Sequence, residues 1–169
     1  MALEDLLSRS KTLIFDTGPL WEFILFQAIH EAGYQLLAPQ LSQMKTQPEF
    51  HRLSSFVDGF VTRTTTPYVV AQLSHFIKTS EKRGRPGTIW KIAHDQFDRM
   101  HIDERLIKLL DMPIETVIRL GAADTSVLEL GLSMLPDQPT ILTSERALFG
   151  KCQSEGLRNT VQLATVIAS

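Results

Sequence analysis

Three acidic residues occur where side chains in an α/β protein could do chemistry. Asp16 ends an apolar run, Asp124 follows a glycine at the start of a helical pattern, and Glu145 opens the helix after a later strand. Each is predicted at a strand-to-helix junction on the carboxyl edge of a sheet, where ligands bind in open α/β folds. Clustered carboxylates repel unless a cation lies among them, and Mg²⁺ or Mn²⁺ suits oxygen ligands. The spacing therefore predicts one metal site.

Each of these residues also has a local interpretation. Asp16 could cap the first helix, and Asp124 could be an N-cap residue. Glu145 could simply favour the positive end of a helix dipole. The residue types alone leave these alternatives open.

The pattern of apolar residues supplies the elements that would position the three carboxylates. An apolar run over 12–15 predicts the first strand, and β-branched residues over 61–66 predict the second. Further strands are predicted over 139–143 and 160–167, and helices over 3–8, 21–34, 47–60, 67–79, 88–100, 113–121, 122–134 and 145–155. Ser144 is predicted as the N-cap of the last helix. Residues 101–112 fit either a helix or a strand.

Alternation of strands and helices indicates an α/β three-layer sandwich, with a central parallel sheet of four to five strands flanked by helices. The 169 residues, 43% of them hydrophobic, are expected to form a single domain over 1–169.

Composition limits the possible partners and compartments. A net charge of −2 gives no general attraction to nucleic acid or to anionic membranes. Cys152 is the one cysteine, which excludes an internal disulfide and fits a reducing compartment. Residues 1–11 do not resemble a signal peptide, and no apolar run approaches the roughly 20 residues that span a bilayer. We expect a soluble, cytoplasmic protein with no membrane partner.

Four segments resemble the signature segments of PIN-domain proteins, in the same order, between residues 12 and 149. They are FDT at 15–17, TPYVVAQLS at 66–74, LGAAD at 120–124 and LTSERAL at 142–148. The resemblance implies a PIN-like α/β fold. It also implies a Mg²⁺- or Mn²⁺-dependent endoribonuclease, as many PIN domains are, including the toxins of bacterial toxin–antitoxin pairs.

The resemblance carries the family's catalytic tetrad onto Asp16, Gln72, Asp124 and Glu145. Gln72 stands where the family has Glu, and Glu145 stands where Asp is usual. The implied reaction is metal-assisted hydrolysis of phosphodiester bonds in single-stranded RNA. Asp16 and Asp124 would hold the cation directly or through water, and Glu145 would complete its outer shell or orient the nucleophile. The neutral Gln72 should weaken cation binding.

Hydroxyl side chains beside the tetrad could support it. Thr17, Ser126 and Thr143 could hydrogen-bond water or phosphate, or could act only as local caps. For the RNA strand, the best local feature is a basic stretch that also contains a tryptophan, by which bases could stack. Its basic residues are Lys78, Lys82, Arg83, Arg85 and Lys91. The alternative is a solvated basic loop.

Two other enzyme classes fit poorly. The Asp-Thr-Gly triplet at 16–18 also occurs in aspartic proteases, but those are β-rich, and here a helix follows at once. Dehalogenase-type phosphatases need a second Asp at the place of Gly18. The remaining alternative is a PIN-like module that has lost catalysis and acts by binding a partner. An antitoxin, another partner protein or a second copy of the chain all remain open as partners.

Overall fold

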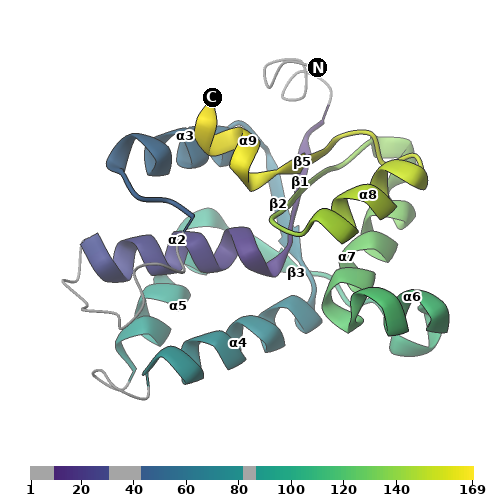
Figure 1. The fold of residues 1–169 in the computed structure, drawn as a ribbon, viewed down its shortest axis with the longest axis horizontal. Coiled ribbons are helices and arrows are strands. Elements are labelled where there is room, and N and C mark those ends of the chain that lie inside the picture. Colours follow the sequence, from purple (N-terminus) through teal and green to yellow (C-terminus); the bar gives the residue numbers. More distant parts are fainter. Residues whose placement is uncertain (1–9, 31–42, 82–86) are drawn as a thin grey trace.

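A five-stranded, all-parallel sheet forms the centre of the protein (Figure 1), as described by a computed structural model over residues 10–30, 43–81 and 87–169. The strand order is β3-β2-β1-β4-β5. The strands are β1 (Thr12–Phe15), β2 (Thr62–Thr65), β3 (Ile102–Glu104), β4 (Thr140–Thr143) and β5 (Thr160–Gln162). The predicted α/β class and parallel sheet are confirmed.

The order of the strands creates a reversal beside β1. The chain moves outward from β1 to β2 and β3, and then returns to the other side of β1 to form β4 and β5. On one side of β1, Leu13 pairs with Arg63 of β2, and on the other it pairs with Thr140 of β4. Ligands of open α/β sheets bind outside the carboxyl ends of the strands where such a reversal occurs. A ligand site is therefore expected at the carboxyl ends of β1 and β4.

Helices cover both faces of the sheet. They are α2 (Thr17–His30), α3 (Gln47–Asp58), α4 (Pro67–Glu81), α5 (Thr88–Met100), α6 (Ile114–Leu120), α7 (Ala122–Ser133), α8 (Arg146–Ser154) and α9 (Leu163–Ala168). In Figure 1, α2, α3 and α5 lie on one side of the sheet, and α7 and α8 lie on the other. This is the arrangement expected of right-handed crossovers, because the chain changes direction after β3. Helix α4 contacts both α2 and α7, so it links the two outer layers.

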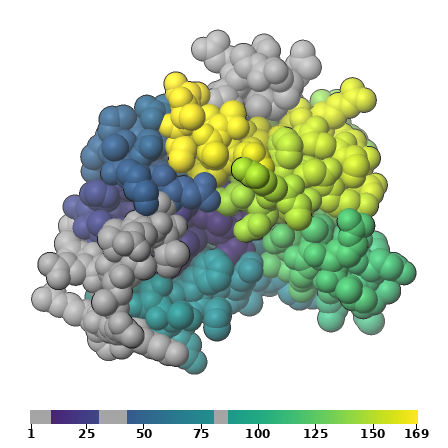
Figure 2. All heavy atoms as spheres, in the orientation of Figure 1, coloured from purple at the N-terminus to yellow at the C-terminus, as the bar shows by residue number. Residues whose placement is uncertain are grey.

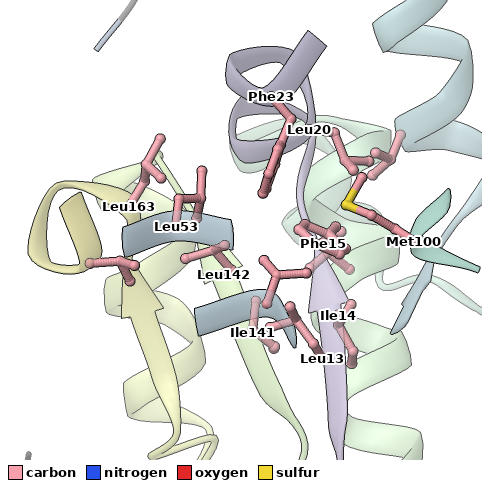
Figure 3. Close-up of a cluster of buried hydrophobic side chains, with 14 of the residues drawn as sticks. Leu13, Ile14, Phe15, Leu20, Phe23, Leu53, Met100, Ile141, Leu142 and Leu163 are labelled. Carbon is pink, nitrogen blue, oxygen red and sulfur yellow. The ribbon is translucent and has the colours of Figure 1, made fainter. Parts of the chain in front are cut away.

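A continuous apolar core surrounds the two central strands. Leu13, Ile14 and Phe15 of β1 have no exposed surface, and neither do Ile141 and Leu142 of β4 (Figure 3). Burying a side chain of this kind contributes about 1.5–3 kcal/mol relative to leaving it exposed. The strand ends are consequently held by a rigid scaffold.

The predicted helix over 88–100 is confirmed at both ends, and residues 101–112 are resolved as a strand followed by a turn. Strand β3 pairs with β2, and a 3₁₀ turn occupies Leu109–Asp111. Within the described residues, no helix is long and apolar enough to cross a membrane. The helix predicted over 3–8 lies outside the described residues.

Three local predictions were wrong. Helix α2 begins at Thr17 rather than Trp21, because a proline in the first turn needs no N–H partner. The last strand ends at Gln162, and α9 replaces the rest of it. The buried residues of α9 are Leu163, Val166 and Ile167, which is helical spacing. The N-cap position of α8 is Glu145, not Ser144.

Candidate functional site

Asp16 lies directly after β1, with a side chain that is 1% exposed. Its Oδ1 accepts a hydrogen bond from the Thr17 backbone N–H at 2.6 Å, and its Oδ2 accepts one from the Thr143 hydroxyl at 2.7 Å. Its own backbone N–H donates to the Leu142 carbonyl at 3.1 Å. Asp16 is thus held in one orientation at the reversal point between β1 and β4.

Thr143, the last residue of β4, connects Asp16 to Glu145. While its hydroxyl donates to Asp16, the same oxygen accepts a hydrogen bond from the Glu145 N–H at 2.9 Å. The Glu145 side chain is exposed and makes no capping hydrogen bond to α8. The carboxylate of Glu145 is therefore available to a ligand, and its backbone is fixed relative to Asp16.

Gly18 allows the start of α2 to approach the end of β4 closely. A Cβ atom at position 18 would lie 2.6 Å from the Ser144 Oγ, which no side chain could tolerate without movement. The Ser144 hydroxyl is buried and has no hydrogen-bond partner among the described residues. The glycine of the Asp-Thr-Gly triplet is thus explained by packing at this junction.

Gln72 reaches the same place from the second turn of α4. Its Oε1 accepts a hydrogen bond from the Thr17 hydroxyl at 2.6 Å, and Thr17 follows Asp16 in the chain. The residue that the sequence placed at the second tetrad position therefore lies beside Asp16. Gln72 is exposed, and its side-chain carbonyl is directed at the Thr17 hydroxyl.

Asp124 lies in the first turn of α7, but the element before α7 is α6 rather than a strand. The prediction of a strand-to-helix junction here was wrong, because helix α6 leads into α7 through Gly121. The N-cap position of α7 is Gly121, and no side chain makes a capping bond there. The interpretation of Asp124 as an N-cap residue was therefore wrong as well.

Electrostatic coupling places the three acidic residues in one neighbourhood. Burial, together with the nearby charges of Asp16 and Glu145, raises the pKa of Asp124 to about 7. Burial also raises the pKa of Asp16, and Glu145 adds to this, while the hydrogen bonds from Thr143 and from the Thr17 and Ser144 backbone oppose it. Paired acids with raised pKa values are common at functional sites.

Ser126 holds two of the site's helices together. Its hydroxyl donates to the Ala123 carbonyl at 2.6 Å and lies 2.6 Å from the hydroxyl of Thr66, just before α4. All of these groups are buried or half-buried. Ser126 therefore acts as a link between α7, which carries Asp124, and α4, which carries Gln72. Thr66 was not singled out from the sequence, although it begins the segment that resembles the second PIN signature.

Of the basic residues proposed for RNA binding, Lys78 lies in the last turn of α4 and Lys91 lies in α5. Lys78 and Lys91 are exposed, and Lys78 lies about 9 Å along the helix axis from Gln72. Lys82, Arg83 and Arg85 lie outside the described residues.

Cys152 lies in α8 with its side chain fully buried. Burial, with a smaller contribution from the charges of Asp16 and Asp124, raises the pKa of its thiol to about 12, although a hydrogen bond involving Thr160 opposes the increase. Because the thiolate is the reactive form, we expect no labelling of the native protein by a disulfide reagent at pH 8. The same protein in urea should label completely. Rapid labelling of the native protein would show that Cys152 is accessible and ionised.

The donor set suits a hard cation. Carboxylate and amide oxygens are the ligands that Mg²⁺ and Mn²⁺ prefer, and a cation would relieve the repulsion that raises the pKa of Asp124. The Asp16 carboxylate accepts hydrogen bonds from the Thr17 N–H and the Thr143 hydroxyl, and its two oxygens offer about four lone-pair positions, so it can also bind a cation. Within the described residues, no three His, Cys, Asp or Glu side chains are gathered closely enough to form a ready-made ion site.

Comparisons with known proteins returned no matching family model, no matching curated protein and no matching solved structure.

Proposed function

We propose that this protein is a PIN-like, metal-dependent endoribonuclease that hydrolyses phosphodiester bonds of single-stranded RNA. The observation that carries the proposal is the arrangement around Asp16. A buried carboxylate is held by Thr143 and Thr17 at the reversal point of a parallel sheet, and it is coupled by charge to Asp124 and Glu145.

Asp16, Asp124 and Glu145 would hold Mg²⁺ or Mn²⁺. The bound cation would supply an activated water and stabilise charge on the phosphate. In this arrangement Thr143 orients Asp16 and fixes the backbone of Glu145, while Thr17 orients Asp16 from the other side and positions Gln72. The hydrogen bond between Ser126 and Thr66 holds α7 against the start of α4.

Protonation of Asp124 makes cation binding at the site depend on pH. With a pKa of about 7, its carboxyl group is partly protonated near neutral pH when no cation is present. Ligand carboxylates must be deprotonated to bind a metal, so cation binding should release a proton. Cation affinity should therefore fall as the pH drops below 7.

Gln72→Glu is expected to tighten Mn²⁺ binding by at least about tenfold, because an opposite charge within about 4–6 Å shifts such equilibria by one to three pKa units. A glutamate can accept the same hydrogen bond from Thr17, so the geometry is preserved. Isothermal titration of Mn²⁺ into both proteins measures the change. RNA cleavage by the variant should also exceed that of the parent protein.

Gln47→Glu at the exposed start of α3 is the matched control, and its Mn²⁺ affinity should equal that of the parent. Equal affinities for Gln72→Glu and the parent would place residue 72 outside the cation site, and would remove the second tetrad position from the proposal.

One observation favours the alternative of a PIN-like module that binds a partner without cleaving RNA. The second tetrad position carries a neutral amide, and its carbonyl already accepts the Thr17 hydroxyl. Such a module would not respond to Mn²⁺. For either function, the protein partner that we expect is an antitoxin, a different protein or a second copy of the chain.

A further inference from the structure

A polar groove of about 520 Å³ runs between α6 and α8. Figure 2 shows these two elements adjoining on one face of the molecule, α6 in green and α8 in yellow-green. The side chains from α6 are those of Glu115, Thr116, Arg119 and Leu120. Those from α8 are Arg146, Ala147, Lys151 and Ser154, together with Gly150.

Positive charge predominates in this groove. Arg119, Arg146 and Lys151 line it, and Glu115 is the one acidic residue in the lining. Lys151 forms an ion pair with Glu155, four residues further along α8. Arg119 and Arg146 are exposed and have no ion-pair partner in the part of the chain that the structure describes. The two guanidinium groups are therefore available to an anion.

The arginines of the groove are close in sequence to two residues of the acidic site. Arg146 directly follows Glu145, and Arg119 lies five residues before Asp124 at the end of α6. On the α8 wall, the lining residues run from Arg146 to Ser154, which is about 12 Å along a helix axis. Ala147 and Gly150, which have a small side chain and no side chain, also line the groove on α8.

We propose that the α6–α8 groove binds the phosphate backbone of single-stranded RNA, with Arg119 and Arg146 contacting phosphates next to the bond that is cleaved. The choice of RNA rests on the proposed function. Arginine binds phosphate through two parallel hydrogen bonds, and a positively charged groove that follows the backbone is the usual way to hold a single strand. The groove thus supplies a path for the strand that the acidic site alone would repel.

Binding of a short, fluorescent single-stranded oligouridylate, measured by anisotropy in a chelator, tests the groove without cleavage. Arg119→Gln and Arg146→Gln should each weaken binding about fivefold at 0.1 M salt, and each should reduce the slope of log affinity against log salt by about 0.7. Arg146→Lys, which keeps the charge, should largely retain the parent's slope.

Arg158→Gln is the control, because Arg158 is exposed and lies on the loop before β5, at the opposite end of the strands. It should bind as the parent does. Equal affinity and salt slope for the parent and both groove variants would overturn the proposal, and so would the absence of binding by the parent.

Gly150 offers a second test that does not depend on removing side chains. A Cβ at this position meets no atom within 4 Å, and both Glu and Gln are better helix formers than Gly. Gly150→Glu and Gly150→Gln should therefore both fold. The Glu variant adds a negative charge to the groove, so it should bind the oligouridylate more weakly than the Gln variant. Equal binding by the two would contradict the proposal.

Glu115→Gln gives an effect of opposite sign. It removes the one carboxylate of the lining and should tighten RNA binding, whereas unchanged or weaker binding would count against a phosphate path. These measurements separate the two proposals. If the parent cleaves RNA but the groove variants bind normally, only the groove is overturned. If binding depends on the groove but Mn²⁺ elicits no cleavage, only the nuclease is overturned.

Discussion

Asp124→Asn is expected to stabilise the metal-free protein at pH 8 and to leave its stability nearly unchanged at pH 4. The folded-state pKa of Asp124 is raised from 3.8 to about 7. Between these values the native state binds more protons than the unfolded state, so stability falls as the pH rises through this window. Asparagine resembles the protonated form and escapes this loss.

The expected gain is large for a single substitution. About three pKa units at about 1.4 kcal/mol each give an upper limit near 4 kcal/mol, which the partial exposure of Asp124 reduces. For a chain of this size, each kcal/mol raises the melting temperature by roughly 2–4 °C. Thermal unfolding in a chelator at pH 4 and pH 8 measures the difference.

Asp103→Asn is the control, because Asp103 is exposed on the edge strand β3. Its melting temperature should follow that of the parent at both pH values. A lower melting temperature for Asp124→Asn at pH 8 would show that the carboxylate stabilises its surroundings, and that no repulsion among the acidic residues exists for a cation to relieve.

Asp16→Asn is expected to reduce Mn²⁺-dependent cleavage by more than about a hundredfold, since loss of an outer partner of a metal ligand alone removes about 10–100-fold. Thr143→Val should fall within that smaller range, because the Thr143 hydroxyl orients Asp16 and fixes the Glu145 backbone. Initial rates at saturating Mn²⁺ measure both effects. The Asp103→Asn variant should keep the rate of the parent.

The difference in cleavage rate between Asp16→Asn and Thr143→Val distinguishes a metal ligand from a helix cap. If Asp16 served only as a cap for α2, neither substitution would alter the rate, and both would lower the melting temperature by an amount corresponding to about 1 kcal/mol. If both variants lost all activity because they were unfolded, their melting curves would show no folding transition.

The fold was predictable because its signals are local. A buried strand ending at Asp16 and the amphipathic pattern over 88–100 need no knowledge of distant residues. The error at the C-terminus has a physical reason. The apolar residues of 160–167 satisfy both a strand and a short helix, and the packing of α9 against α3 selects the helix from Leu163 onward.

The site was predictable only in part. The neighbourhood of Asp16 and Gln72 followed from the resemblance, but the hydrogen bond through Thr17 joins residues 55 positions apart and leaves no local pattern. The α6–α8 groove was missed because its charges come from two helices. Arg146 and Gly150 are nonetheless spaced i, i+4 in the predicted helix over 145–155, and Glu115 and Arg119 have the same spacing in the predicted helix over 113–121. Those spacings were the available signal.

The most direct test of the proposed nuclease is the cleavage of mixed single-stranded RNAs by the purified protein in Mn²⁺, with a chelator added to a parallel reaction and with Asp124→Asn as the paired variant. We expect cleavage by the parent that stops in the chelator and is lost in the variant. Absence of cleavage by the parent, or cleavage that persists in the chelator and in Asp124→Asn, would contradict a metal-dependent site at Asp16, Asp124 and Glu145.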